Sequence, residues 1–307
     1  MGSFKLKNKP TYDKIKTGDK MKEQEYKTKC NTFELKDIFD CGQCFRWNVQ
    51  EDGSYIGVVG NNVIKVSKNG NEINFKSKGE DDLEKLVTYY FDLERDYEKI
   101  KRDLSKIDDN MKKASEYGKG IRILNQDLWE TIISFIISAN NNIPRIKGII
   151  DRISKAYGKE IIFEGNSYYT FPTADELSQA SVEDLRKLGL GFRDVRVHET
   201  TKMIKEKQVD LAQLAKEEDF EKVRNTLLTL PGVGPKVADC ILLFSSLKRW
   251  EAFPIDVWVR RVMNELYIHN EDETKVKKEQ IFKIANEKFG PLAGIAQQYL
   301  FYWKREA

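Results

Sequence analysis

The fold of this chain is decided by the stretches Leu230-Pro-Gly-Val-Gly-Pro-Lys-Val-Ala-Asp-Cys240 and Phe253-Pro-Ile-Asp-Val-Trp-Val-Arg260. In the first stretch, Gly232 and Gly234 stand where the backbone is expected to turn sharply, with positive φ and exposed amides. Pro235 suits the first position of a new helix, because the N–H that it lacks would have no partner there. The first stretch therefore predicts a helix, a tight turn and a second helix.

Two helix starts in these stretches carry candidate chemistry. The amides of Gly232, Val233 and Gly234, beside a helix N-terminus, form a seat for a phosphate group. Lys236 falls in the first turn of the second helix, and Asp256 stands where an N-cap residue belongs. A lysine and a carboxylate so placed are a candidate amine nucleophile and its electrostatic partner. An ordinary hairpin with a surface lysine and a capping aspartate is the alternative interpretation.

Both stretches resemble the helix-hairpin-helix plus Gly/Pro-Asp signature of base-excision DNA glycosylases, and the first is similar to that of the 8-oxoguanine DNA glycosylases. The resemblance implies a helix-hairpin-helix motif at about residues 220–247, with Lys236 and Asp256 as the catalytic pair. It also implies a monovalent cation at the hairpin carbonyls of Leu230 and Val233.

Composition and charge limit the classes of function. The chain has 307 residues, of which 40% are hydrophobic and 33% charged, and it has no apolar run of membrane-spanning length. Because the net charge is only +3, DNA binding must rest on local placement of charges. Residues 1–30 are lysine-rich and are expected to form a solvated arm, and Met1-Gly-Ser is typical of a leader added for expression. We expect a monomer with no membrane partner.

The cysteines favour a reducing compartment and no cofactor. There are four of them, Cys30, Cys41, Cys44 and Cys240. The Cys-x-x-Cys pair has no second pair to complete a zinc site, and no four-cysteine pattern follows the hairpin, so we expect no iron–sulfur cluster. Together with the composition, this favours the cytoplasm of a prokaryote over a nucleus.

The period of the hydrophobic pattern changes along the chain. Residues 31–77 read as strands, beginning with Asn31-Thr-Phe-Glu-Leu35, with turns at Asp52-Gly53, Gly60-Asn61 and Asn69-Gly70. From about residue 81 the period becomes helical. We therefore predict an α+β fold, with an antiparallel sheet subdomain and trailing helices over residues 31–112 and a large helical body over residues 113–307.

Two further segments resemble the part of the family that holds the damaged base. Cys41-Gly-Gln-Cys-Phe-Arg-Trp47 implies that the Gly42 carbonyl accepts the N7 hydrogen that 8-oxoguanine has and guanine lacks. Near the C-terminal end, Gln297 and Phe301 stand four residues apart, on one helix face. The resemblance implies that Gln297 binds the Watson–Crick edge of the base and that Phe301 and Cys240 cover its two faces.

A third group of residues is implied to contact the opposite strand. Asn140-Asn-Asn-Ile-Pro-Arg145 resembles the family segment in which Asn140 would fill the gap left by the extruded base. Arg145 and Arg193 would read the orphaned cytosine, and Phe192 would wedge between bases where the family usually has tyrosine. Trp258 stands where many relatives have a histidine assigned to a phosphate contact.

The resulting hypothesis is a bifunctional N-glycosylase and abasic-site lyase that acts on double-stranded DNA containing 8-oxoguanine, preferably opposite cytosine. Two alternatives remain open at this point. One is a glycosylase for another damaged or mismatched base, which Lys236 and the missing cluster cysteines disfavour. The other is a non-catalytic helix-hairpin-helix DNA-binding module, which Asp256 disfavours because phosphate binding has no use for a carboxylate there.

Overall fold

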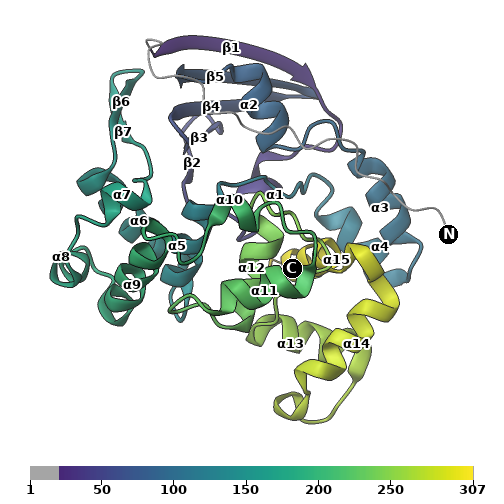
Figure 1. Ribbon diagram of the computed structural model, residues 1–307. Helices are drawn as coiled ribbons and strands as arrows, with labels where there is room; N and C mark the ends of the chain where they lie inside the picture. The colour runs from purple at the N-terminus through teal and green to yellow at the C-terminus, as the bar shows by residue number, and fades with distance from the viewer. Residues whose placement is uncertain (1–20, 307) are drawn as a thin grey trace.

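The computed structural model describes residues 21–306, which form an N-terminal antiparallel sheet followed by a mostly helical body (Figure 1). The sheet has the strand order β1-β5-β4-β3-β2, with β1 (Lys22–Lys29), β2 (Trp47–Val49), β3 (Tyr55–Val59), β4 (Asn62–Asn69) and β5 (Glu72–Gly79). The three predicted turns are confirmed, and Gly53, Gly60 and Gly70 have the positive φ that such turns require. The predicted α+β fold class is therefore confirmed.

Strand β1 corrects the expectation of a solvated arm over residues 1–30. Its outward residues are lysine and glutamate, whereas Gln24, Tyr26 and Thr28 are partly buried. Tyr26 stacks on Phe75 of β5, with ring centroids 6.4 Å apart. Charged residues on the outer face are typical of an edge strand. Because they make the segment lysine-rich, the alternation of exposed and partly buried residues is hard to recognise from composition. The rest of the expected arm, residues 1–20, lies outside the described residues.

The segment Asn31–Leu35 is not a strand, contrary to the prediction, and leads into helix α1 (Leu35–Phe39). Phe33 from this segment is fully buried against Phe75 and Phe91, so its apolar side chain serves the sheet core without joining the sheet. The alternation seen in the sequence therefore reflects one buried anchor between polar neighbours.

The helical body begins after the sheet and continues to the end of the described chain. Its longer helices are α2 (Leu83–Tyr90), α3 (Tyr97–Ser105), α4 (Asp109–Tyr117), α5 (Leu128–Ser138), α6 (Ile143–Tyr157), α9 (Asp194–Lys205), α11 (Phe220–Leu228), α12 (Pro235–Phe244), α14 (Lys278–Phe289) and α15 (Ala293–Glu306). The shorter ones are α7 (Ala174–Leu177), α8 (Val182–Lys187), α10 (Leu211–Leu214), α13 (Val257–Met263), η1 (Gly191–Arg193), η2 (Asn264–Ile268), η3 (Glu273–Lys275) and η4 (Gly290–Leu292). A hairpin of β6 (Glu160–Phe163) and β7 (Asn166–Tyr169), absent from the sequence-based expectation, joins α6 to α7.

Two large hydrophobic cores hold these elements together. One lies under the sheet and includes the stacked pair Phe39 and Trp47, whose ring centroids are 4.3 Å apart. The other surrounds the apolar helix α5 and includes Leu104 of α3 and Met111 of α4. Helices α3 and α4 therefore belong with the helical body, so the boundary between the cores does not coincide with the division expected at residue 113.

Buried polar side chains fix the segment around Gly42 to the helical body. The Gln43 amide donates to the carbonyls of Ile38 and Arg122, both at 2.8 Å, and accepts from the Leu124 amide at 2.9 Å. The Arg122 guanidinium donates in turn to carbonyls of the N-terminal part, including Thr32 at 2.9 Å. Because these groups are buried, breaking one bond would leave a polar group unpaired. This network sets where the Gly42 loop meets the helices.

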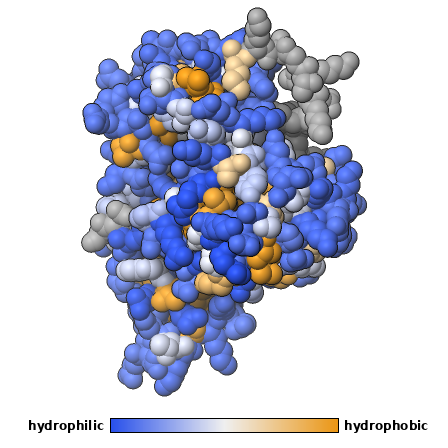
Figure 2. Space-filling model, turned by 90° about the vertical axis from the view of Figure 1, so that its left-hand side faces the viewer, coloured by the Kyte–Doolittle hydropathy of each residue, from blue (hydrophilic) through white to orange (hydrophobic). Residues whose placement is uncertain are grey.

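The outer surface is polar on the face shown in Figure 2, where apolar residues occur in small separate patches among hydrophilic ones. Among residues 21–306, no helix is long and apolar enough to cross a membrane.

Candidate active site

The hairpin between α11 and α12 has the predicted helix-turn-helix form, but its two glycines differ. Gly232 has φ 88°, and a Cβ there would lie 3.0 to 3.1 Å from atoms of Arg196 and Ile136. Gly234 is the extended N-cap of α12 with φ −92°, and a Cβ there would meet nothing within 4 Å. The expectation of positive φ at Gly234 is therefore wrong, and only Gly232 needs to be glycine. The Val233 amide donates within the turn to the Leu230 carbonyl at 3.0 Å.

Lys236 is the second residue of α12 and lies over the Phe135 ring, with 5.6 Å from Nζ to the ring centroid. Cys240 follows one helical turn later and is buried. Burial raises the pKa of the Cys240 thiol to about 11. The pKa of Lys236 is raised above its usual value, chiefly by its interaction with the Cys240 thiol and also by the charge of Asp256, and burial opposes this shift. The helix N-terminus and burial, the two features of this position that would lower the pKa of the amine, are therefore outweighed in the free protein.

Asp256 occupies the predicted N-cap position of α13. Its Oδ1 accepts a hydrogen bond from the Val259 amide at 2.8 Å, which fixes the carboxylate at the start of the helix. The charge of Asp256 acts on Lys236 strongly enough to raise its pKa. The structure therefore places two residues from different helix starts close enough for the carboxylate to raise the pKa of the amine.

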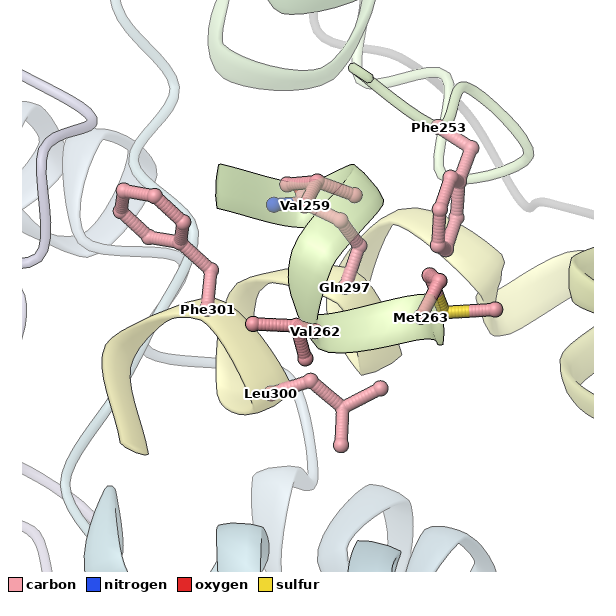
Figure 3. Close-up of a pocket in the computed structure, with 7 residues that line it drawn as sticks. All are labelled: Phe253, Val259, Val262, Met263, Gln297, Leu300 and Phe301. Atoms are coloured by element: carbon pink, nitrogen blue, oxygen red, sulfur yellow. The ribbon is translucent and has the colours of Figure 1, made fainter. Parts of the chain in front are cut away.

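An apolar pocket lies between α13 and α15. Figure 3 shows the α13 ribbon, with Val259, Val262 and Met263, beside α15, with Gln297, Leu300 and Phe301, and Phe253 completes the lining. The lining side chains leave no room for a water molecule in the free protein. The Gln297 Oε1 atom is buried, and no residue among 21–306 gives it a hydrogen bond. A buried acceptor left unpaired is costly, and at a pocket it is a candidate contact for a ligand that donates hydrogen bonds.

Gly42 lies beside Phe301 of helix α15. It has φ 87°, and a Cβ there would lie 3.7 Å from Cε1 of Phe301. The adjacent Cys41 carbonyl accepts a 2.6 Å hydrogen bond from Gln298. The structure therefore connects three of the predicted base-binding residues through Phe301, which lies beside Gly42 and lines the pocket together with Gln297.

The residues predicted for the opposite strand surround the Asn140 loop. Asn140 has φ 51°. Buried Arg193 donates to the Ala139 carbonyl at 2.6 and 2.9 Å and to the Asn140 carbonyl at 2.7 Å. In the free protein Arg193 thus holds this loop, and most of its donors are already used. Phe192 is 56% exposed and lies under the Arg193 guanidinium, 4.2 Å from its ring centroid to Cζ. Arg145 is exposed.

Two arginines at the site did not stand out in the sequence. Arg305 lies 5.1 Å from the Phe301 ring centroid, and its guanidinium donates to the Asp40 carbonyl. Its position four residues after Phe301 on α15 is the signal that helical spacing offered. Arg196 lies 5.2 Å from the Phe192 ring centroid and also contacts the Gly232 turn. Trp258 is 46% exposed and lies 5.8 Å from the Arg261 guanidinium.

Comparisons with known proteins agree with this geometry. Residues 133–287 match the model of the HhH-GPD superfamily of base excision DNA repair proteins, and residues 25–132 match the N-terminal domain of 8-oxoguanine DNA glycosylase. The chain is 33% identical over 245 residues to a probable N-glycosylase/DNA lyase of Methanothermobacter thermautotrophicus, covering 73% of this chain and 76% of the relative. It is 31% identical over 275 residues to the Arabidopsis thaliana N-glycosylase/DNA lyase OGG1, covering 86% and 75%.

A solved structure gives the same result. The 8-oxoguanine glycosylase/lyase of Clostridium acetobutylicum, in complex with double-stranded DNA containing cytosine opposite 8-oxoguanine, superposes with a TM-score of 0.86 at 43% identity, covering 94% of this chain and 98% of that one. The fold and the two helix starts define a helix-hairpin-helix DNA glycosylase of the HhH-GPD superfamily. Within that superfamily, the chain belongs to the 8-oxoguanine DNA glycosylase family.

Proposed function

We propose that this protein is a bifunctional DNA glycosylase and abasic-site lyase, which flips 8-oxoguanine out of duplex DNA and removes it, preferably opposite cytosine. The observation that carries the proposal is that Lys236, one helical turn before Cys240 on α12, interacts with Asp256 at the start of α13. The family relationship supports the substrate, because the Clostridium acetobutylicum relative is described with cytosine opposite 8-oxoguanine.

The chemistry assigned to Lys236 is nucleophilic attack on the sugar. Its amine nitrogen forms a bond to C1′ while the bond from C1′ to the base breaks, and the bonding electron pair leaves with the base, which takes up a proton. Loss of the amine proton and ring opening then give a Schiff base, and β-elimination cleaves the strand on the 3′ side. Asp256 stabilises the positive charge that develops at C1′. Because the pKa of Lys236 is raised in the free protein, the ammonium must lose its proton before attack.

Recognition of the base is assigned to residues of α15 and to residues from the Gly42 loop and α12. The Gly42 carbonyl accepts the N7 hydrogen of 8-oxoguanine, and the same carbonyl repels the N7 lone pair of guanine. Gln297, whose Oε1 has no partner in the free protein, takes a donor on the Watson–Crick edge. Phe301 and Cys240 cover the two faces of the base. Since the pocket is closed in the free protein, its lining must move apart when a base enters.

The remaining contacts are assigned to the DNA backbone and the opposite strand. The hairpin turn at Gly232, Val233 and Gly234 takes a phosphate, and Asn140 and Phe192 fill the space left by the base. Arg145 reads the cytosine together with Arg193, which must first give up bonds to the Asn140 loop. A monovalent cation at the carbonyls of Leu230 and Val233 remains a proposal, and the Leu230 carbonyl already accepts one turn amide. We further propose a monomer that needs no cofactor and works in a prokaryotic cytoplasm.

The test is a single-turnover assay on a labelled duplex with 8-oxoguanine opposite each of the four bases. The expected result is release of the base, fastest opposite cytosine, and a covalent enzyme–DNA adduct when borohydride reduces the Schiff base. Lys236→Gln should abolish trapping while keeping lesion binding, and Asp256→Asn should slow base release by about a hundredfold or more. Trapping that survives in Lys236→Gln shows that another amine is the nucleophile.

The same assay separates the alternatives. Duplexes with an alkylated purine or a mismatched adenine in place of the lesion test for a different glycosylase. A protein that binds all these duplexes equally and releases no base would be a DNA-binding module. The matched control for Lys236→Gln is Lys147→Gln, because that ammonium donates to the Trp47 carbonyl at 2.6 Å, away from the catalytic pair.

A further inference from the structure

We propose that Arg305 is a positioning residue for lesion recognition: it sets the distance between the Gly42 carbonyl and the Phe301 ring, the two groups that hold the damaged base. This inference rests on the proposed function and adds a residue to it. The argument follows from how α15 contacts the N-terminal part of the chain.

Helix α15 has two adjacent working faces. One face carries Gln297 and Phe301, which line the base pocket. The next face carries Gln298, Tyr302 and Arg305, at spacings of four and three residues, so these side chains lie one above another. Helix α15 therefore connects the base pocket to the part of the chain that its second face contacts.

The second face holds helix α1 and the loop that leads to Gly42. Gln298 donates to the Cys41 carbonyl at 2.6 Å, and the Tyr302 hydroxyl donates to Asp37 at 3.1 Å. Arg305 donates to the Asp40 carbonyl at the end of α1. The three contacts run along the segment just before Gly42, and Arg305 makes the one nearest the C-terminal end of α15.

Arg305 also belongs to the base-holding group itself. Its guanidinium lies 5.1 Å from the Phe301 ring centroid, a distance at which a cation is attracted to an aromatic face. A Cβ on Gly42 would lie 3.3 Å from Arg305 Nη1, tighter than an ordinary van der Waals contact. One planar group thus contacts the ring, touches the Gly42 position and is tied to the Asp40 carbonyl.

This arrangement limits where Phe301 can move. The pocket must open to admit a base, and Phe301 is one of the lining residues that must shift. A ring that shifts against a fixed guanidinium returns to one position, which keeps its spacing to the Gly42 carbonyl. Lysine in place of Arg305 would keep the charge but lose the planar surface and the second donor direction. We therefore expect Arg305 to act on base recognition through Gly42 and Phe301, and to have no part in the chemistry at Lys236.

The test uses two substrates for the full-length protein, one with a base and one without. For Arg305→Met, kcat/KM for 8-oxoguanine opposite cytosine should fall about tenfold, mostly through weaker lesion binding. Strand cleavage at a preformed abasic site should be unchanged, because that reaction has no base for Gly42 and Phe301 to hold. Arg305→Lys should recover part of the lost binding.

The matched control is Lys304→Met, which removes a positive charge from the same turn of α15, where Lys304 pairs with Glu265 at 2.5 Å. It should leave both reactions unchanged. Equal losses on the two substrates in Arg305→Met, or no loss of 8-oxoguanine binding, would overturn the proposal. A wild-type protein that cleaves abasic sites but does not release 8-oxoguanine would instead count against the proposed function.

Discussion

Cys240 raises the pKa of Lys236, although the two residues lie one turn apart on a helix whose N-terminal end would favour the uncharged amine. Asp256 acts in the same direction, and burial acts against both. In the free protein at neutral pH, Lys236 is therefore an ammonium ion. The charge of Asp256, which suits the later positive transition state, also favours the ammonium form of Lys236 in the free protein.

The first prediction concerns pH. Below the pKa of Lys236, the fraction of free amine rises tenfold for each pH unit. Cys240→Ser removes the first cause of the raised pKa, so more amine is present at every pH in that range. Borohydride trapping on a preformed abasic site should rise with pH in both proteins, with the curve of the variant displaced to lower pH. The abasic substrate is used because Cys240 is also assigned a face of the base. Superimposable curves would show that the thiol does not control the amine.

The second prediction concerns the hairpin turn. Gly232→Val should weaken binding to every duplex, damaged or not, by about tenfold or more. Left-handed backbone costs an ordinary residue about 1–2 kcal/mol, and a Cβ 3.0 to 3.1 Å from Arg196 and Ile136 forces these neighbours to shift. Gly234→Ala is the matched control, since its backbone is extended and open, and its affinity should be unchanged. Fluorescence anisotropy with an abasic-site duplex measures both. A parallel thermal melt separates loss of binding from loss of folding.

Much of the fold follows from local patterns. The turns at Gly53, Gly60 and Gly70 and the N-cap Asp256 depend on neighbours within a few residues, and the sequence predicts each of them. Strand β1 could not be predicted in the same way. Its inner face has only one large apolar residue, Tyr26, so its pairing depends on β5, far along the chain.

The site shows the same limit. Helical spacing places Gln297 and Phe301 on one face, and the structure brings them to one pocket. The direction of the shift in the Lys236 pKa could not be predicted from the sequence, because burial opposes the effects of two neighbouring groups, Cys240 and Asp256. The contact of Arg305 with the Gly42 loop joins positions at opposite ends of the chain. No local pattern indicates such a contact.

The third prediction separates the two arginines assigned to the opposite base. Arg145 is exposed, so Arg145→Ala should flatten the preference for cytosine and leave the melting temperature unchanged. Arg193→Ala should lower the melting temperature by about 5 °C or more, because the carbonyls of Ala139 and Asn140 lose the buried guanidinium that donates to them. Arg152→Ala is the control, since Arg152 is another exposed arginine of α6 and its guanidinium donates to the Leu188 carbonyl at 2.7 Å. A preserved cytosine preference in Arg145→Ala would remove that residue from the reading site.

The last prediction compares two neighbouring buried glutamines on α15. Gln297 Oε1 has no partner in the free protein, whereas Gln298 donates to the Cys41 carbonyl at 2.6 Å. Replacing an unpaired buried polar group by an apolar one of similar shape removes a cost, so Gln297→Met should raise the free energy of unfolding by about 1 kcal/mol. The same change should weaken binding of 8-oxoguanine DNA by about tenfold, because the base then loses a hydrogen-bond partner. Gln298→Met should instead lower the free energy of unfolding, because it leaves the Cys41 carbonyl unpaired. Chemical denaturation measures the first effect and titration with lesion and abasic duplexes the second. If Gln297→Met destabilises the protein as much as Gln298→Met does, Gln297 has a structural hydrogen-bond partner and is not an unpaired acceptor for the base.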